Sequence, residues 1–176
     1  MYVCDNDPIL LNSKYNVDYH VRAFNKLCTM LKGYVSKIIV SFVDDYKNVR
    51  NNHLDYHEPS NEEYLKLKEA FEKNDMKIVS CMENKYHIGD EKDCCISIKY
   101  AFERTGKLFK EWKARDCHCV NMVDVGAYNS CLHGCKYCYA NFDSKQIVSN
   151  YKMHDVNSSL LIGHLNLDDQ VKIRRK

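Results

Sequence analysis

The run 37-KIIVSFV-43 decides the fold of this chain. It is short, mostly apolar and rich in β-branched residues, which is typical of a strand buried on both faces of a parallel sheet. Two similar runs flank it, 2-YVC-4 before it and 76-MKIVSCM-82 after it. Helical patterns separate the three runs. This order predicts a βαβ series with right-handed crossovers, and therefore a parallel α/β sheet.

The two helical patterns have recognisable ends. In residues 16–31 apolar side chains recur at three- and four-residue spacing, and Gly33 is a suitable C-terminal stop. In residues 60–73 the helix is predicted to begin with a capping box made by Ser60 and Glu63. Both segments are long enough to connect parallel strands across one face of a sheet.

The other elements have weaker signals. A helix is predicted at residues 95–106, ending near Gly106, and a further strand at 120-VNMVDV-125. Residues 44–58 are polar and without a period, so they are predicted to form a long loop. The run 5-DNDP-8 is predicted to be a turn because of its Asp, Asn and Pro residues.

The predicted domain organisation is one continuous domain with two parts. Residues 1–82 are expected to form a βαβαβ segment of a partial (β/α) barrel, and residues 83–176 a cysteine-rich region. Three or four strands are too few for a complete (β/α) barrel, which takes about 250 residues. The predicted fold class is therefore α/β, a barrel-like parallel sheet followed by a cysteine-rich, cluster-binding region.

Composition narrows the class of protein. The 176 residues are 45% hydrophobic and 28% charged, which favours a globular chain over a disordered one. The net charge is +2, from 26 basic and 24 acidic residues, so nothing favours a nucleic-acid partner or a membrane surface. No apolar run approaches a membrane span, and the N-terminus lacks the features of a signal peptide. The predicted location is the cytoplasm.

The cysteine content points to metal chemistry. Ten cysteines are many for such a chain, whereas secreted disulfide scaffolds are usually shorter and carry an export signal. Clustered thiols in a reducing compartment more often bind metal. Cys28 stands apart within an apolar helical pattern and is predicted to be a buried free thiol.

The strongest motif is 128-YNSCLHGCKYCYAN-141, called the cysteine loop below. Cys131, Cys135 and Cys138 have C-x3-C-x2-C spacing, and Gly134 lets the main chain turn tightly. Thiolates are soft ligands that suit zinc or an iron–sulfur cluster. Three cysteines in eight residues are hard to explain by packing alone.

A structural zinc site would need a fourth ligand. His133 lies within the loop, and Cys117, His118 and Cys119 precede it in the sequence. Any of these side chains could complete the site. The spacing alone leaves zinc and iron–sulfur both open.

The spacing, with Tyr137 before the third cysteine, resembles the radical S-adenosylmethionine enzymes. The resemblance implies that three thiolates bind three irons of a [4Fe–4S] cluster, and that the open iron binds S-adenosylmethionine beside Tyr137. It also implies reductive cleavage of the bound cofactor, hydrogen abstraction from a substrate, and an electron donor such as flavodoxin or ferredoxin. By their position after the second predicted strand, Asp44 and Tyr46 could bind substrate or orient a cofactor, whereas Asp45 is expected to be solvated.

Four longer runs carry a closer resemblance: 7-DPILLNSKYNVDYHVRAFNKL-27, 37-KIIVSFVDDYK-47, 123-VDVGAYNSCLHGCKYCYAN-141 and 154-HDVNSSLLIG-163. They are similar to the family of domain of unknown function 1848, which has its cysteine motif near the C-terminus. Its members are longer at the N-terminus, so the resemblance implies a truncated chain whose missing N-terminal half another chain would supply. Where members have Arg-Tyr-Asp-Pro, this chain has 5-DNDP-8.

The same resemblance groups Cys81, Cys95, Cys117 and Cys119 as a second set. Four thiolates fit an auxiliary [4Fe–4S] cluster or a zinc site. Unrelated buried thiols remain the alternative.

The predicted function is a radical-S-adenosylmethionine-like iron–sulfur protein of unknown substrate. The alternative is a zinc-stabilised, non-catalytic structural or binding module, or an inactive fragment.

Overall fold

A computed structural model of the chain describes residues 2–80, 83, 85–89, 94–113 and 118–172. These residues fall into two compact units. Unit 1 consists of Met1–Asp44 and Asp55–Val123, and unit 2 of Asp45–Leu54 and Asp124–Lys176. The predicted division between residues 82 and 83 stays a prediction.

Unit 1 contains a parallel sheet of three strands, as the order of apolar runs predicts. The strands are β1 (Tyr2–Ile9), β2 (Val35–Phe42) and β3 (Lys77–Ser80), and β2 lies in the centre. In the ladder, Ile38 pairs with Cys4 on one side and with Ile78 on the other. The predicted βαβ series is therefore confirmed.

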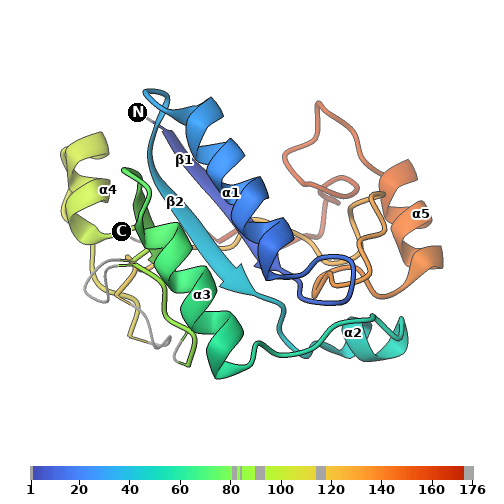
Figure 1. The fold of residues 1–176 in the computed structure, drawn as a ribbon. Coiled ribbons are helices and arrows are strands. Elements are labelled where there is room, and N and C mark those ends of the chain that lie inside the picture. Colours follow the sequence, from blue (N-terminus) through green and yellow to red (C-terminus); the bar gives the residue numbers. More distant parts are fainter. Residues whose placement is uncertain (1, 81–82, 84, 90–93, 114–117, 173–176) are drawn as a thin grey trace. The chain divides into compact units, whose positions relative to one another are not determined.

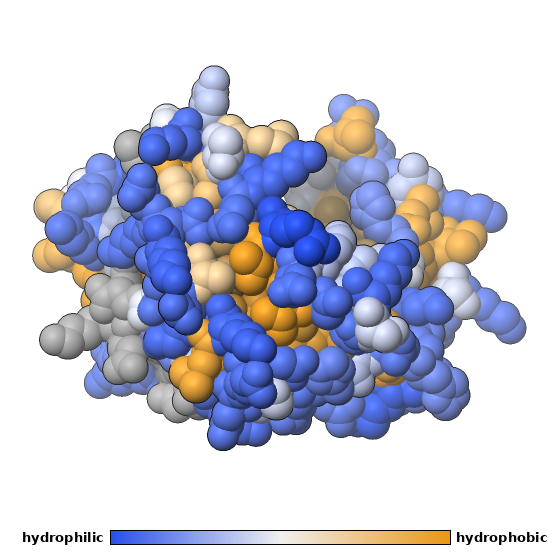
Figure 2. All heavy atoms as spheres, in the orientation of Figure 1, coloured by the Kyte–Doolittle hydropathy of each residue, from blue (hydrophilic) through white to orange (hydrophobic). Residues whose placement is uncertain are grey.

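Two helices cover one face of this sheet. They are α1 (Val17–Leu31) and α3 (Asn61–Glu72), which lie side by side in front of the strands in Figure 1. Both halves of the predicted capping box are present: the Ser60 hydroxyl accepts a bond from the Glu63 N–H at 3.2 Å, and the Glu63 carboxylate accepts one from the Ser60 N–H at 2.9 Å. Hydrophilic side chains cover most of the outward face of these helices in Figure 2.

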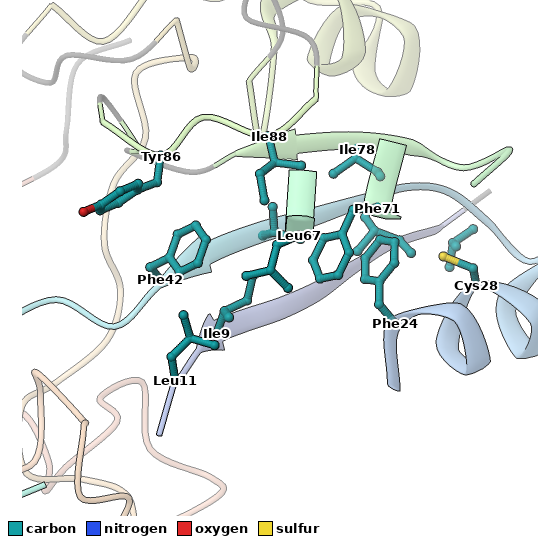
Figure 3. Packing of buried hydrophobic residues seen from close by; sticks show 13 residues of the cluster. Ile9, Leu11, Phe24, Cys28, Phe42, Leu67, Phe71, Ile78, Tyr86 and Ile88 are labelled. Carbon is teal, nitrogen blue, oxygen red and sulfur yellow. The ribbon is translucent and has the colours of Figure 1, made fainter. Parts of the chain in front are cut away.

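The hydrophobic core lies between the helices and the sheet (Figure 3). Phe24 of α1 and Phe71 of α3 stack with ring centroids 3.8 Å apart and planes 8° apart. Ile9, Leu67 and other apolar side chains surround the stacked rings. Cys28 is buried in this core as a free thiol, which confirms its predicted role.

The second half of unit 1 contains α4 (Ile98–Thr105), which confirms the helix predicted at residues 95–106. The Ser97 side chain caps its start by accepting a bond from the Tyr100 N–H at 3.1 Å. Gly106 ends it in the left-handed region, with φ of 67°.

Two predicted elements are wrong. The run 5-DNDP-8 is not a turn but part of β1. In the described sheet β1 is an edge strand that pairs only with β2. An edge strand tolerates a proline because no ladder bond forms along its unpaired side. Residues 120–125 form no strand: Val120 makes a single antiparallel bridge with Glu111, and Val125 is 87% exposed.

Unit 2 contains two helices that the sequence patterns do not predict. The helix α2 (Lys47–Asn51) lies within the predicted loop 44–58, and α5 (Ser144–Lys152) follows the cysteine loop. Asp143 caps α5 by accepting a bond from the Gln146 N–H at 3.0 Å. Each helix within the described ranges falls short of the length or hydrophobicity that a bilayer span requires.

We expect Phe71→Ala to lower the free energy of unfolding by about 3–5 kcal/mol, because it removes one ring of the buried stack and leaves a cavity. Urea denaturation of the metal-free chain measures this loss. Leu65→Ala is the matched control in the same helix. Leu65 is 58% exposed, so its replacement should change stability by less than about 0.5 kcal/mol. Equal losses in the two variants would contradict this view of the core.

Candidate functional site

The three cysteines of the C-x3-C-x2-C motif lie on one irregular loop of unit 2. All three are free thiols; Cys131 and Cys135 are exposed and Cys138 is half-buried. In the described residues their sulfur atoms take part in no hydrogen bond. The structure therefore keeps the thiols of the cysteine loop available as ligands.

The C-x2-C half of the motif is a tight turn. The Cys138 N–H donates to the Cys135 carbonyl at 3.1 Å, and such a turn brings its first and fourth Cα atoms to within about 7 Å. Gly134, just before it, has φ of 64°, a conformation that side chains with a Cβ rarely adopt. Glycine is the residue that this conformation favours at position 134.

The helix α2 holds the end of the cysteine loop through two asparagines. Asn48 is only 5% exposed, and its side-chain amide donates to the Cys138 carbonyl at 2.6 Å and also to the Asn141 carbonyl. Asn52 donates in the same way to the Lys136 carbonyl at 3.1 Å. A segment far away in the sequence thus fixes the main chain on either side of Tyr137.

Asn129 joins the two ends of the cysteine loop through hydrogen bonds. It is buried and adopts a left-handed conformation with φ of 55°. Its side-chain oxygen accepts bonds from the N–H groups of Phe142 and Asp143, at 2.8 and 3.1 Å. Its own N–H donates to the Ala140 carbonyl at 2.9 Å.

Two further asparagines complete this arrangement. The Asn141 amide donates to the Cys131 carbonyl at 2.7 Å, and the amide of buried Asn150 in α5 donates to the Asn129 carbonyl at 3.1 Å. We call the five residues the asparagine scaffold: Asn48, Asn52, Asn129, Asn141 and Asn150. Four of these side chains donate to main-chain oxygens, and the side-chain oxygen of Asn129 accepts from main-chain N–H groups, so the scaffold fixes the main chain of the loop with uncharged groups.

Aromatic rings lie beside the loop. Tyr139 contacts Tyr46 and Tyr128, with centroids 5.8 and 6.3 Å apart, and Tyr128 contacts Phe142 at 6.1 Å. Tyr137, the predicted cofactor-binding residue, is 38% exposed. These rings give unit 2 an exposed apolar surface next to the cysteines.

The structure brings the three thiols onto one loop without gathering them around one point. Within the described ranges, no three His, Cys, Asp or Glu side chains form a group that could hold a metal ion. Three free thiols on a short, anchored loop nevertheless suit the ligand chemistry of iron–sulfur and zinc centres.

The second cysteine set is described only in part, because Cys81 and Cys117 lie outside the described residues. Cys95 is half-buried and Cys119 is buried, and neither belongs to a disulfide bond. The thiol of buried Cys94 donates to the His118 carbonyl at 3.1 Å, and the Val120 N–H donates to the Ile96 carbonyl at 2.9 Å.

These two bonds join segments 94–96 and 118–120 in the same direction, so that positions 95 and 119 lie at the same level. The segments 94–96 and 118–120, which carry Cys95 and Cys119, therefore lie side by side. His118, a candidate ligand, has its Nδ1 2.6 Å from the Glu111 carboxylate.

Near the carboxyl ends of the strands lies an acidic side chain, Glu83, that the sequence patterns do not reveal. Asp44, the other predicted cofactor-binding residue, is exposed just after β2 and belongs to unit 1, whereas the cysteine loop belongs to unit 2. Glu83 accepts a bond from the Phe42 N–H at 2.6 Å. Burial raises the pKa of Glu83 to about 7; the hydrogen bond from the Phe42 N–H opposes this rise, and the negative charges of Asp44 and Asp7 add smaller increases.

We expect Asn48→Ala to loosen the cysteine loop, because it leaves two loop carbonyls without their amide donor. The free energy of unfolding should fall by about 1–3 kcal/mol, and amide hydrogen exchange should accelerate in residues 136–142. Asn51→Ala is the matched control, since Asn51 is an exposed residue of the same helix. Unchanged exchange in Asn48→Ala would show that the scaffold does not hold the loop.

We expect the stability of the metal-free chain to depend on Glu83 between pH 4.5 and 7. The folded state holds the Glu83 proton more tightly than the unfolded state, whose pKa is near 4.5. This contribution is fully present below pH 4.5 and is lost as the pH rises through about 7. Glu83→Gln should remove that loss and be more stable than the parent at pH 8, by on the order of 1–2 kcal/mol because solvent screens a half-buried group.

Urea denaturation at a series of pH values measures the effect of Glu83→Gln. The control is Glu103→Gln, which changes an exposed residue of α4 and should keep the pH dependence of the parent. A Glu83→Gln variant with that same pH dependence would refute the raised pKa.

Comparison with known proteins places the chain in a family. The family model of a domain of unknown function (DUF1848) matches residues 5–140, a range that contains the strands β2 and β3 and all three cysteines of the loop. No curated protein and no solved structure matches the chain. The match extends over most of the 176 residues, and the chain therefore belongs to the DUF1848 family.

Proposed function

We propose that this protein is a radical-S-adenosylmethionine-like iron–sulfur protein of unknown substrate. Cys131, Cys135 and Cys138 would hold three irons of a [4Fe–4S] cluster and leave the fourth iron open to S-adenosylmethionine. When bound, these groups supply the reductive cleavage that begins hydrogen abstraction from a substrate. The chain's own part is to bind, position and shield them.

The observation that carries the proposal is an anchored loop with free thiols. The carbonyls of Cys131, Lys136 and Cys138 each accept a bond from the asparagine scaffold. A thiolate-bound cluster is anionic, and carbonyl oxygens that already face amide donors repel such a group less. The anchoring also reduces the conformational entropy that the loop must lose when it binds a cluster.

The N–H groups of the loop support the same assignment. Within the described residues, the main-chain N–H groups of residues 132–135 donate no hydrogen bond. Successive free N–H groups in a turn form a site for anions, and hydrogen bonds to cluster sulfurs tune iron–sulfur centres. The loop therefore offers thiolates and unused donors in the same short segment.

The remaining assignments follow from the resemblance. Tyr137 would lie beside the adenine of S-adenosylmethionine, and Asp44 would orient cofactor or substrate. The parallel sheet of unit 1 would be part of a (β/α) barrel-like fold. The second cysteine set would hold an auxiliary cluster, and a flavodoxin- or ferredoxin-like protein in the cytoplasm would supply electrons.

A zinc-stabilised module without catalysis is the second candidate, and one observation favours it. His133 is exposed on the cysteine loop and makes no hydrogen bond within the described residues. It could act as the fourth ligand that a structural zinc site requires.

Anaerobic reconstitution of the full chain with iron and sulfide tests the proposal. We expect an iron–sulfur cluster, with S-adenosylmethionine cleaved under dithionite. Cys131→Ala, Cys135→Ala and Cys138→Ala should each lose about four irons and four sulfides relative to the parent.

Cys4→Ala removes a half-buried thiol of unit 1 as the matched control and should keep the full iron content. Zinc without sulfide would support the second candidate instead. Protein that takes up neither metal would overturn both.

A further inference from the structure

A pocket lies beside the start of the helix α4, in unit 1. Its lining comes from Ile98 in the first turn of α4, from residues 109–113 and from Asn121. Its volume is about 580 Å³. Pockets of about 300–1,000 Å³ are usual for small-molecule ligands, so this one has the size of a binding site.

Hydrogen bonds hold the two segments that carry most of the lining. The Asn121 N–H donates to the Lys110 carbonyl at 2.7 Å, and the Trp112 N–H donates to the Cys119 carbonyl at 2.8 Å. Val120, between the two bonded positions of its segment, is buried. The main chain of the pocket is therefore fixed before any ligand binds, as in most small-molecule sites.

Two aromatic residues give the pocket an apolar wall. Phe109 is 38% exposed, and Trp112 is half-buried. Aromatic rings on a pocket wall offer flat surfaces on which a planar ring system can stack. This part of the lining therefore suits a ligand with a planar ring.

The same pocket carries two positive charges. Lys110 and Lys113 are both exposed, and both line it. Glu111 also lines it, but its carboxylate lies 2.6 Å from the Nδ1 atom of His118. Ammonium groups bind phosphate through charge-assisted hydrogen bonds, so two lysines beside an apolar wall favour a ligand with a negatively charged group.

We propose that this pocket binds a nucleoside monophosphate, a small ligand that combines a planar base with a phosphate group. The base stacks on Phe109 and Trp112, and the phosphate binds Lys110 and Lys113. The side-chain amide of Asn121 offers both donors and an acceptor to the polar edge of a base.

The volume of the pocket favours one nucleotide over a nucleic acid chain, because pockets of this size enclose ligands the size of a drug molecule. The site lies in unit 1 and uses none of the cysteines of the proposed function. The two proposals can therefore fail independently.

The fluorescence of Trp112 gives the test a local signal, because it is the single tryptophan of the chain. Titration of the full chain with adenosine monophosphate should change this emission, since a stacked base alters the surroundings of the ring. Adenosine and inorganic phosphate each carry only part of the ligand. Measured by competition, each should bind at least about tenfold more weakly than the nucleotide.

Substitutions of the lining identify the groups that bind. Lys110→Gln and Lys113→Gln should each weaken nucleotide binding by roughly tenfold, because each removes a charged hydrogen-bond donor. Lys107→Gln is the matched control, an exposed lysine of the same segment outside the lining. Phe109→Ala should also weaken binding by roughly tenfold. Leu108→Ala, which changes an exposed neighbour outside the lining, should keep the affinity of the parent.

Several results would overturn the inference. One is the absence of binding, by fluorescence and by equilibrium dialysis, of the adenosine, guanosine, cytidine and uridine monophosphates at millimolar concentration. Another is adenosine that binds as tightly as its monophosphate, since the lysines would then recognise no charge. Equal losses in Lys107→Gln and Lys110→Gln would attribute the effect to the net charge of the surface. A single-stranded oligonucleotide that binds far more tightly than the monophosphate would assign this surface to a nucleic acid chain instead.

Discussion

The strand β2 lies between β1 and β3 and is covered on both faces, so almost every group it carries must find a partner inside unit 1. Its main chain bonds to parallel neighbours, and parallel pairing requires the long helical crossovers that α1 and α3 provide. Its core-facing residues Ile38 and Val40 pack under those helices. Lys37, on the other face, differs from these apolar residues: it carries a charge although it is only 5% exposed.

Elements with strong local signals could be predicted from the sequence, and elements held by tertiary contacts could not. The helix α3 has a capping box and a clear period, so both its start and its type were predictable. The helix α2 has only five residues, too few for a period to show. Residues 120–125 have the composition of a strand but no neighbour that pairs along their length, and composition alone does not supply one.

In the candidate site, too, some residues could be predicted from the sequence and others depend on tertiary contacts. Spacing reveals the three thiols of the cysteine loop and Gly134, because ligands and turn residues lie close together in the sequence. The asparagine scaffold reaches the loop from α2 and α5, and an asparagine that binds a distant carbonyl has no signature of its own. The raised pKa of Glu83 likewise depends on burial that its sequence neighbours do not encode.

The bond between Asn48 and Cys138 joins residues 90 positions apart, and this separation sets the order in which unit 2 can be completed during synthesis. At a translation rate of about 5–20 residues per second, α2 leaves the ribosome on the order of ten seconds before the cysteine it holds. A five-residue helix is not stable alone, so α2 must wait for the loop. The thiols are therefore anchored only after all three strands of the unit 1 sheet have been synthesised.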